Sequence, residues 1–524
     1  MARVNKNTTA ELRPVTFRAR DRRALYQQLA EGIGQQIRDG SVEPGAKLPP
    51  LRELARLHRV ALVTASQAYE LLSSDGLVES RSGRGTFVSA DVDAVAGRLK
   101  ASAATDARLQ ATATTLTSGA LDTRRGAALR MLRSAVRPGT IVLSTGNTAP
   151  ETYPLADFAQ CYARTFLDDP PEIHQYRADR GDPELRALFA DRLRARGADI
   201  RADDILVVSG AQQALSLVAD ALIDRGGAAV AEAPTYFSAL EVFDQKRVTW
   251  ANAAVDADGV QPKSLREAVW RTAPRIAYLN TAAQNPTGSF LARPRHREVL
   301  EIARRAQLTI IEDQSFWPVS FDGEAPPPLM ASDGDGRVVL MESMSKLYMP
   351  SLRIGYIAAK GRALEALYAA KLRADAFTTT VAQRALLRFL QSKAAARHLR
   401  AARFAYLRRR DALLGALRNV LPDGATVSIP RGGVNLWVEL PKSWSALGLL
   451  GYAAQEGVVF LTGDPFYPTD PPQHALRMSY GNLPEDVAPE AMARFGRAVR
   501  AYATARKRGE RSAAAEEAAI TAAV

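Results

Sequence analysis

Alternation of short apolar runs with helical patterns, between residues 205 and 358, constrains the fold of this chain more than any other feature. Strand-like runs cover residues 205–208, 228–231, 275–279, 309–311, 338–341 and 354–358, and a helical pattern over 212–223 follows the first of them. Such alternation predicts a mainly parallel sheet sandwiched between helices. In sheets of that kind, ligands bind where the strands end.

The residues that follow the run at 338–341 suggest which ligand. That run leads into Ser343, Ser345 and Lys346, and Arg353 follows seven residues after the lysine. An amine held beside hydroxyls and a guanidinium suits a Schiff base to an aldehyde whose phosphate must be neutralised. Pyridoxal phosphate is such an aldehyde. The alternative is an ordinary surface lysine after a strand. The residues at the neighbouring strand ends help to decide between the two interpretations.

Two other strand ends carry residues of the right chemistry. The turn at 209–213 (SGAQQ) joins a strand to a helix N-terminus, where free backbone N–H groups and the helix dipole can hold a phosphate. Glu312 and Asp313 follow a buried run, and a carboxylate there could keep a pyridine nitrogen protonated. Asn285, in the motif NPTG, follows another strand.

The N-terminal part has a different pattern, over residues 20–90. Helical periodicity is found at 25–37, 51–58 and 63–73, and a two-stranded hairpin is expected at 77–81 and 84–88. Three short helices and a basic hairpin predict an α+β winged helix-turn-helix, whose third helix enters the major groove with Thr64 and Gln67 on its outward face. A winged helix that binds only protein is the alternative.

The run from 40 to 88, GSVEPGAKLPPLRELARLHRVALVTASQAYELLSSDGLVESRSGRGTFV, resembles the GntR-type DNA-binding domain over nearly its whole length. The resemblance implies that Arg52 contacts phosphate or base and that Thr64 belongs to the recognition helix. Arg81 and Gly85 would belong to the wing, and Arg84, in the same basic hairpin, is a further candidate DNA contact.

This domain departs from the family pattern at two places. Pro50 stands where the family usually has a serine, so a hydroxyl N-cap of the second helix is lost. Ala61 and Leu62 stand where the family usually has Ser-Arg at the start of the third helix. Because an arginine there would bind phosphate or guanine strongly, its loss should weaken binding or change the preferred site.

Across roughly 350 residues, the later motifs resemble the fold-type I aminotransferases, and the whole chain resembles the MocR group of GntR regulators. The resemblance implies an α/β fold with large and small subdomains. It also implies that Lys346 forms the aldimine with the cofactor, that Asp313 pairs with the pyridine nitrogen and that Asn285 bonds the phenolic oxygen of the ring.

The same resemblance implies the other contacts. Tyr236 would stack on the cofactor ring, and Tyr176 would reach in from the partner subunit of a homodimer. Arg477 would bind an amino acid's carboxylate in a forked pair of hydrogen bonds, and Gly146 is a second candidate effector contact. The cofactor phosphate would be held by Ala211, Gln212, Ser343, Ser345 and Arg353.

One departure bears on turnover. The family places a tyrosine two or three residues after the aspartate, and here those positions hold Ser315 and Phe316. Without a phenol that stabilises the deprotonated ring oxygen, we expect a raised aldimine pKa and poor turnover.

Length and composition set the domain plan. A chain of 524 residues exceeds one ordinary domain, and its formal net charge of +13 permits a polyanionic partner. We expect a DNA-binding domain at 20–90, a flexible linker at 91–140, a cofactor domain at 141–505 and an Ala-rich tail at 506–524. The single cysteine, together with no apolar run long enough for a membrane span, favours a cytoplasmic protein without a metal cluster.

Three functions are compatible with these patterns. The first is a transcriptional regulator that binds a double-stranded DNA operator and senses a small amine or amino acid through an aldimine at Lys346. The second is a working aminotransferase with a vestigial DNA-binding domain. In the third, pyridoxal phosphate itself is the signal. The missing phenol favours a sensor over an efficient transaminase.

Overall fold

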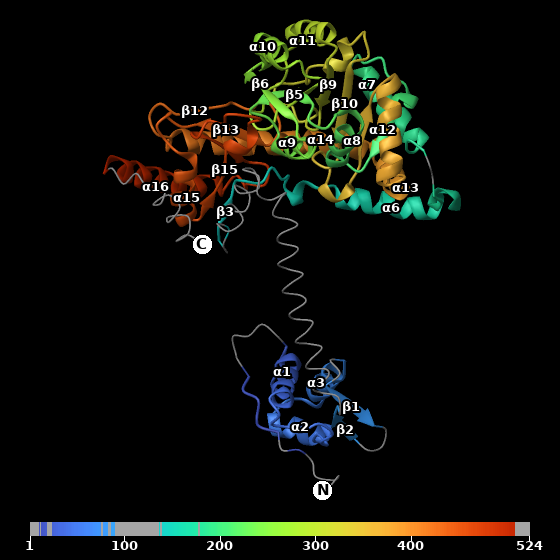
Figure 1. The fold of residues 1–524 in the computed structure, drawn as a ribbon, viewed down its shortest axis with the longest axis vertical. Helices are drawn as coiled ribbons and strands as arrows, with labels where there is room; N and C mark the ends of the chain where they lie inside the picture. Colours follow the sequence, from blue (N-terminus) through green and yellow to red (C-terminus); the bar gives the residue numbers. More distant parts are fainter. Residues whose placement is uncertain are drawn as a thin grey trace. The chain divides into compact units, whose positions relative to one another are not determined.

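The structure, a computed structural model, describes residues 10, 12–17, 24–74, 77–81, 85–89, 136, 139–176 and 179–508. The chain divides into two compact units, Met1–Ala120 and Leu121–Val524 (Figure 1). Most of the expected linker, the end of the expected tail from residue 509 and the wing residue Arg84 lie outside the described residues.

The first unit is a winged helix, as predicted. Its elements are α1 (Leu25–Arg38), α2 (Leu51–His58), α3 (Leu62–Ser74), β1 (Val78–Arg81) and β2 (Gly85–Val88). The two strands pair antiparallel, and an isolated bridge joins Lys47 to Phe87 at the side of the wing. Leu29 and Ile33 of α1 are buried with Leu54 of α2, because apolar residues four apart share one helix face.

One expectation about α2 is wrong. Apolar periodicity predicts that Leu57 faces inward, but it is exposed, because Leu54 and His58, four residues apart, take the inward face. The imidazole Nδ1 of His58 accepts a hydrogen bond from the backbone N–H of Val15 at 3.2 Å. At the other end of α2, Pro50 caps the helix without a side-chain hydrogen bond, as its sequence position predicts.

The second unit is built on an eight-stranded sheet of order β4-β11-β10-β9-β8-β5-β6-β7. The strands are β4 (Ile205–Val208), β5 (Ala228–Ala233), β6 (Thr249–Asp256), β7 (Gly259–Val260), β8 (Ile276–Asn280), β9 (Thr309–Asp313), β10 (Val338–Ser343) and β11 (Gly355–Ala358). Neighbouring strands from β10 through β9, β8 and β5 to β6 are parallel, whereas β11 is antiparallel to both of its neighbours. The predicted mainly parallel sheet is therefore confirmed.

Helices cover both faces of this sheet (Figure 1). Side chains alternate between the faces along each strand, so that Leu206 packs in one core and Val207 in the other. One core contains residues of α8 (Ala211–Leu222), α9 (Phe237–Asp244) and α12 (Gly361–Ala374). The opposite core contains residues of α7 (Pro183–Ala195), α10 (Pro262–Thr272), α11 (Arg293–Ala306), α13 (Thr380–Gln391) and α14 (Lys393–Arg418).

A smaller subdomain follows α14. Its sheet has the order β12-β13-β16-β15, with β12 (Thr426–Val427), β13 (Asn435–Glu439), β15 (Leu461–Thr462) and β16 (Ala475–Ser479). The helices α15 (Ala446–Gln455) and α16 (Ala488–Lys507) belong to it. The first described strand of the second unit is β3 (Ile141–Val142), which pairs with β14 (Val458–Val459) of the smaller subdomain. The helix α6 (Leu155–Asp168) follows β3 along the chain.

Within the described residues, no helix combines the length and the apolar character that crossing a bilayer requires.

Candidate functional site

The carboxyl ends of the central strands open into a cavity of about 490 Å³. Its lining comes from both subdomains and consists of Ser144, Thr145, Gly146, Ala211, Gln212, Tyr236, Phe237, Asn285, Asp313, Ser315, Ser343, Ser345, Lys346, Arg353, Leu461 and Arg477. A cavity of this size accommodates a small-molecule ligand. It therefore collects most of the site residues that the sequence predicts.

Lys346 lies in the loop after β10, with its side chain in the cavity. Its Nζ donates a hydrogen bond to the backbone oxygen of Gly146 at 2.9 Å. Burial lowers the pKa of Lys346 to about 8, and the charges of Arg477 and Arg353 act in the same direction. At pH 7 roughly a tenth of this amine is therefore neutral and nucleophilic, far more than for a lysine with the usual pKa.

Asp313 ends β9 and is almost completely buried. Tyr278 Oη donates to its Oδ2 at 2.7 Å, and the backbone N–H of Ser315 donates to its Oδ1 at 2.9 Å. Burial raises the pKa of Asp313 although these hydrogen bonds oppose the shift. Among the described residues, no cationic side chain pairs with this carboxylate, so a protonated heteroaromatic nitrogen would supply the missing charge.

A helix N-terminus and the guanidinium of Arg353 also lie at the cavity. Gly210, at φ 87°, precedes α8, whose first backbone N–H groups have no partner within the helix. Arg353 donates to the backbone oxygen of Ser209 at 2.8 Å and to Ser345 Oγ at 3.4 Å. A helix N-terminus beside a guanidinium and hydroxyls fits a phosphate group.

This turn is held in place from outside the cavity. Gln213 accepts a hydrogen bond from the backbone N–H of Ser209 at 2.7 Å and donates to Asp375 at 2.7 Å. Lys371, which is buried, donates to the other oxygen of Asp375 at 2.7 Å. The turn therefore has a side-chain connection to the segment between α12 and α13.

Arg477, on β16, brings a third positive charge to the cavity from the small subdomain. It is 3% exposed, it donates to Asn285 Oδ1 at 3.3 Å and to the backbone oxygen of Ser144, and its Nε has no partner. Burial lowers its pKa to about 10. Since no carboxylate of the described residues pairs with it, this guanidinium fits an incoming carboxylate.

Asn285 is oriented by the small subdomain. Its Oδ1 accepts from Arg477 and, at 3.4 Å, from Asn435. The side-chain NH₂ of Asn285 is thereby the group left to donate to a ligand in the cavity.

Of the residues predicted to contact the cofactor or the effector, all but one line the cavity. The cavity brings together Lys346, Asp313, Asn285, Tyr236, Ala211, Gln212, Ser343, Ser345, Arg353, Arg477 and Gly146. Tyr176 does not line it: its side chain is 93% exposed and meets the ring of Phe377 edge-on at 5.9 Å. In the single chain, the exposed side chain of Tyr176 can therefore contact another molecule.

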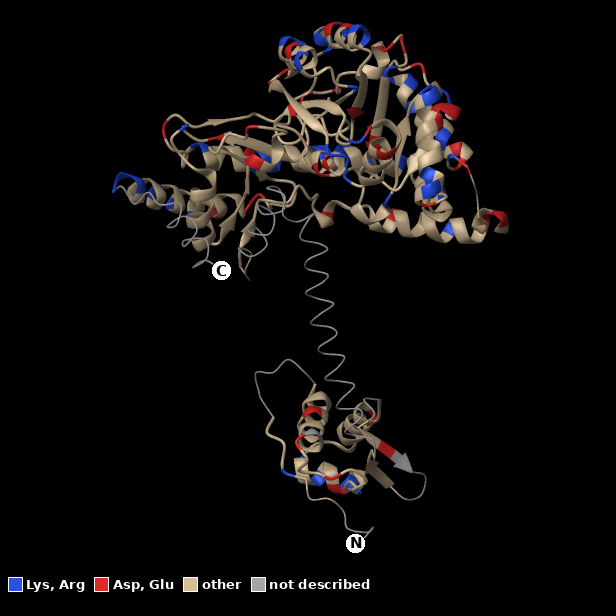
Figure 2. Cartoon of the chain, viewed as in Figure 1, with Lys and Arg blue, Asp and Glu red and all other residues tan. Residues whose placement is uncertain are grey.

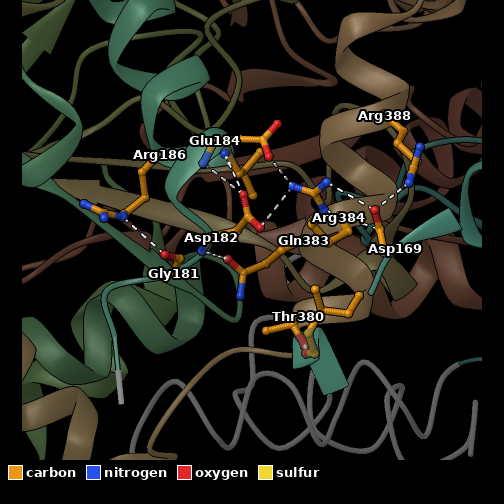
Figure 3. Close-up of polar contacts among 11 residues, drawn as sticks. Asp169, Gly181, Asp182, Glu184, Arg186, Thr380, Gln383, Arg384 and Arg388 are labelled. Carbon is orange, nitrogen blue, oxygen red and sulfur yellow. Dashed lines mark hydrogen bonds and ion pairs between the residues drawn. The ribbon is translucent and has the colours of Figure 1, made fainter. Parts of the chain in front are cut away.

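The segment that carries Tyr176 is anchored to α13 (Figure 3). Arg384 pairs with Asp169 at 3.2 Å, with Asp182 at 3.4 Å and with Glu184 at 2.8 Å. Arg388, one turn later on α13, also binds Asp169, at 2.6 Å. Both ends of the segment from 169 to 182 are thus attached to one helix.

Several residues of the site were not predicted from the sequence, among them Ser144, Asn435, Tyr278 and Ser315. Ser144 is delivered by pairing of β3 with β14, for which the sequence gives no local signal. Asn435 follows the Gly432-Gly433 pair, which does mark a close backbone approach. Tyr278 lies inside an apolar strand, and Ser315 was noted only for the tyrosine it replaces.

The structure distinguishes the two positions where the family pattern places a phenol. Phe316 is buried in the hydrophobic core and does not line the cavity. Ser315 does line it and is 9% exposed. A small hydroxyl therefore stands where the family pattern has a tyrosine.

In the first unit, Arg52 of α2 and Gln67 of α3 are exposed and Thr64 is half-buried. Gly85 begins β2 at φ 107°. Only the backbone of Arg81 is described, at the end of β1, and Arg84 lies outside the described residues.

Comparisons with known proteins agree with this geometry. Residues 139–495 match the model of aminotransferase class I and II, and residues 25–88 match that of the bacterial regulatory proteins, gntR family. The crystal structure of LysN, an alpha-aminoadipate aminotransferase from Thermus thermophilus, is 29% identical and superimposes with a TM-score of 0.67, covering 72% of this chain and 95% of that one.

Several relatives cover more of this chain than its second unit alone. An uncharacterized HTH-type transcriptional regulator of Bacillus subtilis, YdfD, is 29% identical over 84% of this chain and 89% of its own length. The probable rhizopine catabolism regulatory protein MocR of Rhizobium meliloti is 27% identical over 88% of this chain and 90% of its own.

Proposed function

Because the chain belongs to the class I and II aminotransferase family and carries a gntR-family regulatory domain ahead of it, we propose that it is a regulator whose DNA affinity responds to a small amine or amino acid bound beside pyridoxal phosphate. The family's cofactor is pyridoxal phosphate, and the cavity residues fit it. Effector sensing is the part of this function that needs testing.

The residues of the cavity divide the work. Lys346 would hold the cofactor covalently, Asp313 would keep its ring nitrogen protonated, and Arg353, with the start of α8, would bind its phosphate. When bound, the cofactor supplies an electrophilic carbon and an electron sink. Arg477 would orient a ligand by its carboxylate, and the fixed amide of Asn285 would donate toward the ring.

The observation that favours sensing over turnover is the environment of Ser315. Its small hydroxyl lines the cavity, while Phe316 packs in the core, so neither supplies the phenol of an efficient aminotransferase. A ligand could therefore bind and change the closure of the small subdomain, through Arg477 of β16, without rapid conversion.

A working aminotransferase is the second candidate. In its favour, Lys346, Asp313 and Arg477 line one cavity, and the 29% identical solved structure is that of an aminotransferase. The two candidates differ in whether a keto acid leaves the site.

Absorbance spectroscopy separates the candidates. The full-length protein loaded with pyridoxal phosphate would be titrated with amino acids and amines, beside a Lys346→Ala control. A spectral change that persists without a keto acid, together with changed operator affinity, would support the sensor. Rapid release of a keto acid would instead favour the aminotransferase, and a response to free cofactor alone would make pyridoxal phosphate the signal.

The proposed regulator is a homodimer. Exposed apolar side chains gather along α6 and the segment after it: Leu155, Phe166, Leu167 and Tyr176. A surface of this kind is typical of an interface, and the anchoring of the segment by α13 would present Tyr176 to the partner's cavity.

Hybrid dimers test this assignment. If Tyr176 acts in the partner's cavity, a mixture of Tyr176→Ala and Lys346→Ala subunits forms dimers in which one cavity carries both defects and the other neither. We expect such hybrids to bind pyridoxal phosphate tightly at half their sites. Loss of tight binding at every site would place Tyr176 in its own subunit's cavity.

A further inference from the structure

We propose that Leu62 and Val63, at the start of α3, select operator sequences by packing against the 5-methyl groups of thymine in the major groove. This inference rests on the proposed DNA-binding function and names the base chemistry that the site reads. One of the two residues, Leu62, stands where the family usually has an arginine.

The evidence begins with where apolar side chains lie on α3. Its inward face is filled by Ala65, Ala68 and Leu72, all buried in the core of the first unit. Leu62 and Val63 are not part of that core, and they are 49% and 66% exposed. Packing of the winged helix therefore does not account for two consecutive large apolar residues at this end of the helix.

The surroundings of this apolar end suit DNA. The exposed residues Arg52, Arg56 and Arg59 lie on or directly after α2, the preceding helix, which carries Lys and Arg colour in Figure 2. None of these three arginines forms an ion pair with a described residue, so they can neutralise phosphates beside the groove. The charge of the neighbouring helix thus argues for a polyanion as the occupant.

The helix geometry decides which residues reach the bases. In a helix-turn-helix, the N-terminal residues of the recognition helix contact base edges. Leu62 and Val63 occupy the first turn of α3, and Gln67 is exposed one turn later. Glu70, which accepts from Ser66 Oγ at 3.3 Å, lies farther along the helix. The base-reading surface therefore combines two apolar side chains with one amide.

That combination matches A·T pairs. Apolar side chains contact the thymine methyl, the single apolar group on the major-groove edge of the bases, and glutamine pairs with adenine N6 and N7. An arginine at position 62 would instead favour guanine. The operator half-site should contain at least one thymine whose methyl meets Leu62 or Val63, next to an adenine read by Gln67.

Replacing thymine with deoxyuridine tests the contact directly, because it removes only the methyl. Full-length protein loaded with pyridoxal phosphate would first select duplexes from a random library. Each thymine of the selected duplex would then be replaced in turn, and affinity measured by fluorescence anisotropy at fixed salt. We expect one or two positions per half-site at which the replacement weakens binding by roughly three- to tenfold.

Protein variants combined with the modified duplexes show whether Leu62 and Val63 make the contact with the methyl group. A Leu62→Ala, Val63→Ala double variant should lose affinity for the thymine duplex and become insensitive, within about 1.5-fold, to deoxyuridine at those positions. The matched control is Leu25→Ala, which removes a similarly exposed leucine from α1 and should keep the full methyl effect. A Leu62→Arg variant should select guanine at that position.

The outcomes distinguish this inference from the function on which it rests. Equal deoxyuridine effects in wild type and in the double variant, or no effect at any thymine, would overturn the methyl contact while leaving operator binding intact. A protein that selects no sequence at all would overturn the regulator function and the contact together.

Discussion

At the scale of single residues, the low pKa of Lys346 is the most direct chemical consequence of the fold. Only the neutral amine reacts with an aldehyde, and its fraction rises as pH rises through the folded pKa. Because that pKa is about 8 and not the usual 10.5, cofactor-free protein should react with pyridoxal phosphate at a rate that increases up to about pH 8 and then levels. Absorbance-monitored kinetics across pH measures this.

The cause of the shift can be tested as well. Arg477 is one of the two charges that lower this pKa, so Arg477→Gln should move the inflection to higher pH, whereas Lys346→Ala should abolish the reaction. An inflection near 10.5 in the wild type would contradict the buried position of the lysine.

Arg477 should also determine which ligands the cavity accepts. Its buried guanidinium has no carboxylate partner among the described residues, so it is available to bind the carboxylate of a ligand. Arg477→Ala should therefore weaken the binding of an amino acid by roughly 10- to 100-fold. The amine that lacks only the carboxylate should change less than about threefold. Titration with such pairs measures the effect, and Arg477→Lys, which retains charge without the forked geometry, should be intermediate. Equal losses for both ligands would show a merely structural role.

Ser315 offers a gain of function. Ser315→Tyr should raise the rate of keto acid formation at least about tenfold, since a phenol reaching the cavity can stabilise the ring oxygen of the cofactor. Phe316→Tyr is the matched control, because its hydroxyl would enter the hydrophobic core and not the cavity. The measurement is keto acid release under saturating amino acid, and faster release by the Phe316 variant alone would mean that the other position provides the phenol.

At the scale of elements, what could be predicted depended on how local the signal is. α2 extends over 51–58 and β4 over 205–208 as expected, because apolar periodicity and flanking turns are contained in the element itself. β6 (TWANAAVD) was missed, since few of its residues favour strands and a polar Asn252 interrupts it. The antiparallel direction of β11 follows from a connection from Ser343 to Gly355 that is too short for a crossover.

The site divides in the same way. Lys346, Asp313, Asn285 and Arg353 stand in motifs at strand ends, and their positions follow from the sheet that the sequence predicts. Ser144 reaches the cavity only because β3 pairs with β14, which lies far along the chain. Contacts of that range depend on packing of the whole unit, which no local pattern encodes.

Ion pairs to α13 attach the segment that carries Tyr176, and their contribution to stability can be measured. Arg384→Ala would leave the largely buried carboxylates of Asp169 and Asp182 with fewer cationic partners, so unfolding free energy should fall by about 3 kcal/mol. Arg304→Ala, which breaks an exposed pair with Glu301, should lower the unfolding free energy much less, because water screens that pair. Denaturant unfolding of both variants makes the comparison, and similar losses would count against the anchoring role.

At the scale of the whole molecule, a regulator must couple its two units energetically. If a ligand in the cavity changes operator affinity by a given factor, the operator must change ligand affinity by the same factor, which for such couplings is roughly 5 to 150. Titrating the ligand with the selected duplex, and with an unrelated duplex as control, measures this. A ligand whose affinity is the same with both duplexes would not be the effector.

One contact path in the large subdomain has a consequence for the proposed dimer. Gln213 connects the turn at Ser209, proposed to bind the phosphate, to Asp375, and two residues later Phe377 packs against Tyr176, the residue proposed to reach the partner. Asp375, which holds the turn of one cavity, and Phe377, which contacts the tyrosine proposed to reach the other cavity, therefore lie in the same short segment. Filling the first cavity would rigidify what the second requires, so the two subunits would load cooperatively, and the half-loaded dimer would be rarer at half saturation than two independent sites would make it.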